Sequence, residues 1–401
     1  MREELHSGGK VDRHGRWWPK KDRCPAPVAP DAPPLPWSAP RLLRRFNSTL
    51  DADDAEASRN SRSVYGFQSA TRACAAGVPA SSSTVLASTS HASATCMDGA
   101  ETLRTKRLRL LIGVHSAPAG RRRRDAIRES WMRWPSVGRS TLVCFLVGTG
   151  QLPPAALDSL TTEAALHRDL VLLRDVADVC VLSMPKAYAW WRHAATLLPS
   201  GAAHVGKVDD DTFVNVPRLE AHLDTLRCHR HLLYGTIAYS GYNPETFGKC
   251  AFSWGSVHSP YKKYRCSERG FHPPVPFATG PMQVLSAALV DQLASSSLVA
   301  DFCSRAEASL DLGRWDLSED TALGWWLSQV PNSRITYVHA SKSQANNLGC
   351  KKHRDIYQRP SNDSIVIHFV KKPLGFQYLW ETLNERRPHD VARCLKMAGV
   401  D

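Results

Sequence analysis

The residues best suited to chemistry are three consecutive aspartates, Asp209, Asp210 and Asp211, which follow a short apolar strand predicted over 204–208. Three adjacent carboxylates repel each other, and neither a strand nor a turn requires them. A hard divalent cation would neutralise them, and carboxylate oxygens suit Mg²⁺ or Mn²⁺. Because side chains alternate along an extended chain, Asp209 and Asp211 can point the same way while Asp210 points back.

An acidic turn of this kind can also be a solvated cap that complements the dipole of the following helix. Two observations favour a metal and nucleotide site instead. A buried strand leads directly into the turn, and open α/β sheets bind ligands beyond the carboxyl ends of their strands. Lys207 also lies close by in the sequence, so that a cation flanks the carboxylates.

A second acidic centre follows Ser318, which is a good N-cap for a helix that begins with Glu319 and Asp320. Two acids in a first helical turn often do no more than complement the helix dipole. With the aspartate turn as a partner, however, Asp320 becomes a candidate general base that could deprotonate an attacking hydroxyl.

Two further side chains are candidates for the same site. His368 lies on a strand predicted over 364–373, and a lone histidine of this kind is usually a satisfied core residue. Beside an aspartate, its neutral imidazole would be an ordinary ligand for Mn²⁺. Arg128 lies on a short helix predicted over 125–131, where its guanidinium could reach a diphosphate. The preceding basic run, 121–124, is interpreted as a solvated loop.

The elements that must position these residues alternate between strands and helices. This order predicts an α/β sandwich with a largely parallel central sheet. The remaining length fits one catalytic domain over 105–401. Buried strands are predicted over 108–114, 141–147, 170–173 and 204–208, and a helix bearing two tryptophans is predicted over 187–198.

The first 104 residues have a different composition. Residues 19–40 are rich in proline and residues 80–95 are almost all Ser, Ala and Thr, which bury too little apolar surface to offset the entropy of ordering. We therefore expect a mostly disordered stem over 1–104, with a small folded domain as the alternative.

Charge, cysteine content and hydropathy limit the class of protein further. A net charge of +13 favours acidic partners such as nucleic acid, phosphorylated sugars or anionic membranes. Eleven cysteines without a C-x-x-C pair argue against a zinc ribbon and suit a secretory-pathway enzyme with a few disulfides. No apolar run reaches the roughly 18 residues of a membrane span.

Five segments of the chain carry a resemblance to a known family. They are, in order, RRRRDAIRESW, LRDVADVCVLSMPKAYAWW, KVDDDTFVN, SEDTALG and IVIHFVKKP. Their order and approximate spacing resemble those of the β-1,3-galactosyltransferase family, which includes β-1,3-N-acetylglucosaminyltransferases and is related to fringe. The resemblance covers about residues 108–380, and the alanine- and arginine-rich texture of the chain is loosely similar to trypanosomatid phosphoglycan β-1,3-galactosyltransferases.

The resemblance implies a hexosyltransferase with a GT-A fold, that is, a Rossmann-like sandwich with a mostly parallel sheet behind the stem. It also implies Mn²⁺, a donor such as UDP-galactose or UDP-N-acetylglucosamine, and inverting transfer to the 3-hydroxyl of a glycan or phosphoglycan. Carried over residue by residue, it makes Asp211 and His368 metal ligands, Asp320 the catalytic base, and Asp209, Asp210, Lys207 and Arg128 residues of the nucleotide side.

Two departures from the family pattern bear on these expectations. The family usually has a loop of the kind Y-x-x-G-x-G-Y-V-x-S, whereas this chain keeps Gly280 and Ser286 but places Pro281, Met282 and Gln283 between them. The donor and the acceptor therefore stay open. The family also carries an N-terminal anchor and works in the Golgi lumen or at the Golgi membrane. The first explanation for the missing anchor is a truncated chain, and the second is a soluble protein.

Other functions remain as alternatives. A metal-dependent phosphoesterase or nuclease would use the aspartates as a two-metal site, but it would require further clustered acids or histidines. A non-catalytic, glycan-binding member of the same fold is compatible with the changed loop but does not require the retained acids. Nucleic-acid binding would suit the charge but lacks a recognised motif.

Overall fold

The structure is a computed structural model. It describes residues 108–150, 152–178, 183–244, 274–308, 319–330, 335–351 and 356–398, single residues at 95, 96, 98 and 103, and the backbone at 10–11, 17–18 and 248–250. Almost all of the predicted stem and the proposed N-cap Ser318 lie outside the described residues. At residues 10–11 and 17–18 the backbone forms two short paired strands, β1 (Lys10–Val11) and β2 (Trp17–Trp18).

A large mixed sheet forms the centre of the molecule, and its order is β11-β8-β10-β6-β3-β4-β5, with β9 paired to β8. The neighbours β6, β3, β4 and β5 are mutually parallel, as are β8 and β11. β10 is antiparallel to both of its neighbours. The strands are β3 (Leu110–His115), β4 (Thr141–Gly150), β5 (Leu170–Ala177), β6 (His204–Asp209), β8 (Leu232–Asn243), β9 (Gly248–Cys250), β10 (Pro274–Ser286) and β11 (Thr336–His339).

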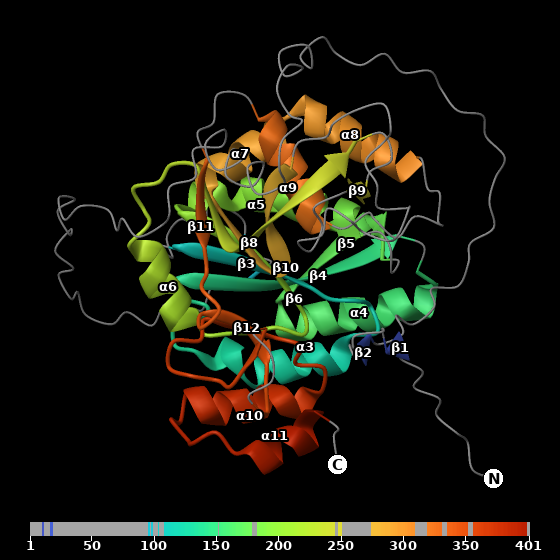
Figure 1. The fold of residues 1–401 in the computed structure, drawn as a ribbon. Coiled ribbons are helices and arrows are strands. Elements are labelled where there is room, and N and C mark those ends of the chain that lie inside the picture. Colours follow the sequence, from blue (N-terminus) through green and yellow to red (C-terminus); the bar gives the residue numbers. More distant parts are fainter. Residues whose placement is uncertain are drawn as a thin grey trace, which may run out of the picture.

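Helices cover both faces of this sheet (Figure 1). One face carries α5 (Ser183–Leu197), α7 (Ala287–Ser295), α8 (Ser297–Ala308) and α9 (Glu319–Gln329). The other carries α3 (Arg121–Arg128), α4 (Pro154–His167), α10 (Pro373–Leu383) and α11 (Val391–Ala398), while α6 (Val216–Asp224) packs into the core of that same face. The predicted α/β class with a mostly parallel central sheet is therefore confirmed.

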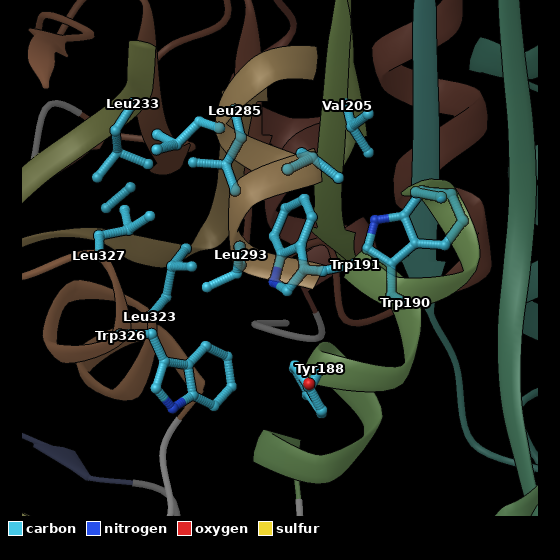
Figure 2. Close-up of a cluster of buried hydrophobic side chains, with 14 of the residues drawn as sticks. Tyr188, Trp190, Trp191, Val205, Leu233, Leu285, Leu293, Leu323, Trp326 and Leu327 are labelled. Atoms are coloured by element: carbon cyan, nitrogen blue, oxygen red, sulfur yellow. The ribbon is translucent and has the colours of Figure 1, made fainter. Parts of the chain in front are cut away.

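The core on the α5 side is built around tryptophan side chains (Figure 2). Trp190 and Trp191 of α5 and Trp326 of α9 are fully buried. The indole of Trp190 donates to the Gly206 carbonyl oxygen at 3.0 Å. A Cβ at Gly113 would lie 2.5 Å from the Trp190 ring, so only glycine lets α5 approach the sheet this closely. This packing fixes β3 and β6, whose ends form the site.

The basic run 121–124 is not the solvated loop that the sequence predicted. It begins α3, and Arg124 is completely buried. Arg124 donates to Glu163 of α4 at 2.8 and 2.6 Å and to the Ala117 carbonyl oxygen at 2.7 Å. The prediction was wrong because Glu163, which is distant in the sequence and could not be recognised there as a partner, offsets the desolvation cost of the Arg124 guanidinium.

A smaller second sheet has the order β13-β12-β14-β7. β14 pairs antiparallel with β7, with Val366 opposite Val214 and Ile367 opposite Phe213. Because β7 comes directly after the aspartate turn, this pairing brings the end of β14 to the end of β6. The strands are β7 (Phe213–Val214), β12 (Ala345–Leu348), β13 (Tyr357–Gln358) and β14 (Val366–His368).

Disulfides tie the outer parts of the fold to its core. Cys96 is bonded to Cys144 of β4, and Leu103 is fully buried in the core on the α5 side. Residues before the expected boundary at 105 thus contact the domain that was predicted over 105–401. Cys350 is bonded to Cys394 of α11. These bonds agree with the expectation of partial disulfide pairing. Among the described helices, none combines the length and the apolar character needed to cross a membrane.

Candidate active site

The three aspartates diverge at the carboxyl end of β6, as side-chain alternation predicted. Asp209 and Asp211 face a common cluster with His368, and one ligand atom from each residue lies within 4.8 Å of the others. Asp210 points to the opposite side, where its carboxylate accepts from Arg123 at 2.7 Å and from the Ser116 hydroxyl at 3.1 Å. The turn therefore serves two environments.

The donor set of the first environment fits a divalent cation. His368 Nδ1 lies 3.0 Å from the Asn347 amide oxygen, which can only accept, so this nitrogen carries the proton. In a neutral imidazole the lone pair then lies on Nε2, which is 3.2 Å from Asp211 Oδ1. Because Nε2 and Oδ1 are then both hydrogen-bond acceptors, their close approach requires a proton or a cation between them. Carboxylate oxygens and an oriented imidazole are suitable ligands for such an ion.

Lys371 completes this cluster, and the sequence did not predict it. Its ammonium contacts Asp211 Oδ2 and lies 4.7 Å from the centre of the Phe369 ring. Burial alone would raise the pKa of Asp211, but a proton on His368 Nε2, which can take the place of the cation, and the charge of Lys371 hold that pKa well below its usual range. The backbone N–H of Val370 also donates to the Asp211 carbonyl oxygen at 2.9 Å. The only sequence signal for Lys371 was its place shortly after the histidine.

The side chain of Lys207 is buried between the carboxylates of the two acidic centres. Its side chain has no exposed area, and its ammonium donates to Asp209 at 2.6 Å, to Glu319 at 2.6 Å and to the Gly280 carbonyl oxygen at 3.0 Å. Burial alone would lower the pKa of Lys207, but the charges of Asp209 and Glu319 outweigh it and raise that pKa. All three donors of Lys207 are matched by protein acceptors, so none is free in this structure for the contact with a nucleotide that the resemblance implied.

The second acidic centre lies next to the first, as the sequence predicted. Glu319 begins α9 and reaches Lys207, and the charge of Lys207 lowers the pKa of Glu319 to about 2 against the effect of burial. Asp320, the next residue, accepts from the Thr321 backbone N–H at 2.7 Å. A Cβ at Gly280 would lie 3.3 Å from Glu319 Oε1 and 3.4 Å from Asp209 Oδ2, so a glycine separates the two centres.

The loop that departs from the family pattern belongs to β10. Its pairing with β8 is irregular between Ala278 and Gln283, and Gln283 is buried opposite Lys207. The Gln283 amide nitrogen donates to the Ala278 carbonyl oxygen at 3.1 Å across this bulge. The bulge directs the Gly280 carbonyl oxygen to Lys207. The retained Gly280 thus lies at the junction between the two acidic centres, whereas Met282, one of the substituted residues, is buried in the core on the face that carries α3 and α4.

Arg128 lies in an ion-pair network around α3 and α4. It donates twice to Asp169 at 2.8 Å, and also to Glu163 at 2.8 Å and to Asp125 at 2.6 Å. Every guanidinium nitrogen of Arg128 thus meets a carboxylate, and its role at a nucleotide stays a prediction. Arg123 of the same helix, which the sequence did not single out, contacts the aspartate turn instead.

Comparisons with known proteins bear on the family of this chain. Residues 122–314 match the sequence model of the Galactosyltransferase family. Beta-1,3-galactosyltransferase GALT1 of Arabidopsis thaliana is 24% identical over 289 residues, which are 70% of this chain and 38% of that protein. Beta-1,3-galactosyltransferase 6 of Mus musculus is 28% identical over 230 residues, 56% of this chain and 62% of that protein.

An N-acetylglucosaminyltransferase also matches over a shorter stretch. N-acetyllactosaminide beta-1,3-N-acetylglucosaminyltransferase 2 of Mus musculus is 35% identical over 123 residues, 29% of this chain and 30% of that protein. The chain thus spans less than two thirds of the length of these relatives. The narrower resemblance to trypanosomatid enzymes stays a prediction.

Solved structures of two glycosyltransferases overlap with this chain at low scores. Mouse xyloside xylosyltransferase 1 has a TM-score of 0.31 and 10% identity, covering 65% of this chain and 96% of that one. The galactosyltransferase LgtC has a TM-score of 0.35 and 10% identity, covering 72% of this chain and 95% of that one.

Proposed function

Because the chain belongs to the galactosyltransferase family, we propose that it transfers galactose or N-acetylglucosamine from a UDP-sugar to the 3-hydroxyl of a glycan, with inversion at the anomeric carbon. The observation that carries the proposal is the meeting of two acidic centres. The cluster of Asp209, Asp211 and His368 lies at one end of the Lys207 bridge, and the helix turn that bears Asp320 lies at the other.

In the proposed mechanism, Asp209, Asp211 and His368 hold a divalent cation, for which Mn²⁺ is our candidate. When bound, this ion supplies positive charge for the diphosphate of the donor. Asp320 accepts the proton of the acceptor hydroxyl while that oxygen forms its bond to the anomeric carbon. The bond from this carbon to the UDP oxygen breaks, and UDP leaves with the electron pair without needing a proton.

Within the proposed site, Asp210 has a different task from its two neighbours. It is held by Arg123 and Ser116 on the β3 side of the turn, away from the metal cluster. This position suits contact with the ribose or uracil. The buried guanidinium of Arg124, which donates to Ser116 at 3.1 Å, fixes the loop after β3 against the same turn.

A phosphoesterase is less well supported. Two-metal phosphoryl chemistry uses two ions about 3.5–4 Å apart. Among the described residues, a single cluster of three potential ligand residues is found.

We further propose that the enzyme works in the Golgi lumen, which its disulfides and family favour.

Asp320→Asn tests the proposed base. The full chain is incubated with Mn²⁺ and an acceptor series against UDP-galactose, UDP-N-acetylglucosamine and UDP-glucose in turn. We expect wild-type transfer from one donor and a fall in kcat of about 10²–10⁴-fold in Asp320→Asn, because only the proton acceptor is lost. UDP affinity, measured by calorimetry, should stay within about twofold.

The matched control is Asp301→Asn on the neighbouring helix α8, where the carboxylate is exposed and pairs with Arg305. This variant should keep wild-type kcat. Unchanged turnover in Asp320→Asn would remove Asp320 as the base, and absence of transfer from all three donors in the wild type would remove the proposed donor class.

A further inference from the structure

The ammonium of Lys207 joins three separate elements at one point. It bonds to Asp209 on its own strand β6, to the Gly280 carbonyl oxygen on β10, and to Glu319 on α9. An ammonium has three donors, so these contacts satisfy it completely. No surface of the side chain remains for a substrate. Lys207 can therefore act on a reaction only through the groups that it holds.

Those groups belong to the two halves of the proposed site. Asp209 is part of the metal-binding cluster, and Glu319 directly precedes Asp320 in the first turn of α9. A single buried cation thus fixes the spacing between the metal cluster and the turn that carries the proposed base. The hydroxyl of Ser183, at the start of α5, adds a second hydrogen bond to Glu319.

Neighbouring backbone leaves this bridge little freedom. The space between Glu319 and Asp209 is so narrow that a Cβ at Gly280 would lie within 3.4 Å of both carboxylates. One and a half turns along α9, Gly324 lies directly against β10, where a Cβ would be 2.7 Å from the Pro276 carbonyl oxygen. The helix is therefore anchored by close packing along its length and by an ionic bridge at its first residue.

We propose that Lys207 and Glu319 are positioning residues. Their buried ion pair holds the first turn of α9, and with it Asp320, at a fixed distance and orientation relative to the metal cluster. This inference rests on the proposed transferase function. A buried ion pair need not add stability, since well-packed apolar residues often replace one at little cost. Its value here is geometric, because a misplacement of about 1 Å in a reacting group can cost about 10²-fold in rate.

Glu319→Ala tests the bridge while it leaves the pair between Lys207 and Asp209 in place. We expect kcat to fall by about 10–10²-fold, with the KM for the UDP-sugar within about threefold. Glu319→Gln keeps an acceptor oxygen for the ammonium and should recover most of this loss. A merely structural role would lower the unfolding temperature but leave kcat per folded molecule unchanged.

Glu381→Ala on α10 is the matched control. Glu381 has the same side-chain exposure as Glu319, 12%, and pairs with Arg393 of α11 outside the site. It should lower stability without changing kcat. Wild-type kcat in Glu319→Ala, or an equal fall in Glu381→Ala, would overturn the proposal. If Glu319→Ala does not fold, the double variant Lys207→Met/Glu319→Met removes both charges and should show the same fall in kcat.

Hydrogen exchange separates this proposal from the transferase assignment, because it needs no activity. In Glu319→Ala, or in the double variant, amides of residues 321–326 should exchange faster than in the wild type, while amides of α10 should not change. Faster exchange in a wild-type-folded protein that transfers no sugar would support the bridge and refute the activity. Unchanged exchange at 321–326 would overturn the bridge whatever the activity.

Discussion

His204 and Asp209 lie at the two ends of the same buried strand, β6. The fold provides a partner of opposite charge for Asp209, whereas it disfavours the charged form of His204. Burial raises the pKa of Asp209, and the positive charge of the buried Lys207, its partner, offsets only part of that effect. His204 has only the weaker opposing charge of Asp224. Burial, together with the positive charge of Arg227, lowers the pKa of His204 to about 4. A neutral imidazole is therefore the form that the fold selects.

This difference predicts a loss of stability in mild acid. The pKa of a histidine in the unfolded chain is about 6.5. Between pH 6.5 and about 4 the unfolded state binds the extra proton and the folded state does not, so the free energy of unfolding falls as the pH drops. The loss from His204 approaches about 3 kcal/mol at the acid end of this window and is absent above pH 6.5.

Urea unfolding between pH 7.5 and 4.5 measures this slope. His204→Leu removes the titrating group and should flatten the decline between pH 6.5 and 4.5, although it changes the stability at pH 7.5 by a constant amount. The same slope in His204→Leu as in the wild type would show that other groups cause the acid sensitivity.

Single residues also mark how far the sequence could predict the site. Asp211 and His368 lie together as their donor types and the order of the motifs led us to expect. Asp209, which the resemblance placed on the nucleotide side, lies in the same cluster, on the side that side-chain alternation predicted. Lys371 and Arg123 were missed, since an isolated basic residue gives no local signal and its partner is chosen by the fold. Lys207 was expected at the nucleotide, but burial and three protein acceptors turn it inward.

At the scale of elements, the close contact between α9 and β10 depends on a glycine. Gly324 lies one turn after Asp320, and a Cβ there would be 2.7 Å from the Pro276 carbonyl oxygen and 2.8 Å from Phe277 Cβ. Both are backbone or backbone-attached atoms, which cannot rotate away. Any side chain at this position must push the helix off the strand.

Gly324→Ala should therefore both destabilise the protein and slow the proposed reaction. Overpacking costs about 1–3 kcal/mol, which the better helix propensity of alanine, about 1 kcal/mol, only partly offsets. Because the shift of α9 also moves Asp320, kcat should fall by about tenfold or more. Thermal unfolding and steady-state transfer assays measure the two effects.

Ser328→Ala, on the exposed side of the same helix, is the control and should change neither quantity appreciably. A Gly324→Ala variant with wild-type stability would mean that β10 yields to the helix. The bulge in β10 would then have to absorb the strain.

Elements differed in how well the sequence predicted them, for physical reasons. The parallel strands β3, β4, β5 and β6 were found because strands covered on both faces are continuous apolar runs. In the second sheet, β14 was predicted from its apolar run, whereas β7, β12 and β13 are two to four residues long, too short for any periodicity to appear. The start of α3 was missed because its four arginines resemble a solvated run, whereas Glu163 buries Arg124.

At the scale of the whole molecule, the proposed metal site spans two sheets. The large sheet supplies Asp209 at the end of β6, and the small sheet supplies His368 at the end of β14. Asn347 of β12, which orients the imidazole, lies three residues before Cys350, the residue that is bonded to Cys394 of α11. The disulfide thus closes the small sheet and the C-terminal helices into one unit that presents the histidine.

Removal of this disulfide should affect the metal site as well as stability, whereas removal of the other should affect stability alone. The two bonds close loops of similar sequence separation, 44 residues for Cys350–Cys394 and 48 for Cys96–Cys144. A chain-entropy model gives each about 4 kcal/mol, so Cys350→Ala/Cys394→Ala and Cys96→Ala/Cys144→Ala should lose similar free energies of unfolding in urea. Mn²⁺ titration followed by electron paramagnetic resonance should show weaker binding, by about 10–100-fold, only in Cys350→Ala/Cys394→Ala, since loss of the groups that orient a metal ligand typically costs that much. Equal Mn²⁺ affinities in the two double variants would show that the pairing of β14 with β7 holds His368 in place without the disulfide.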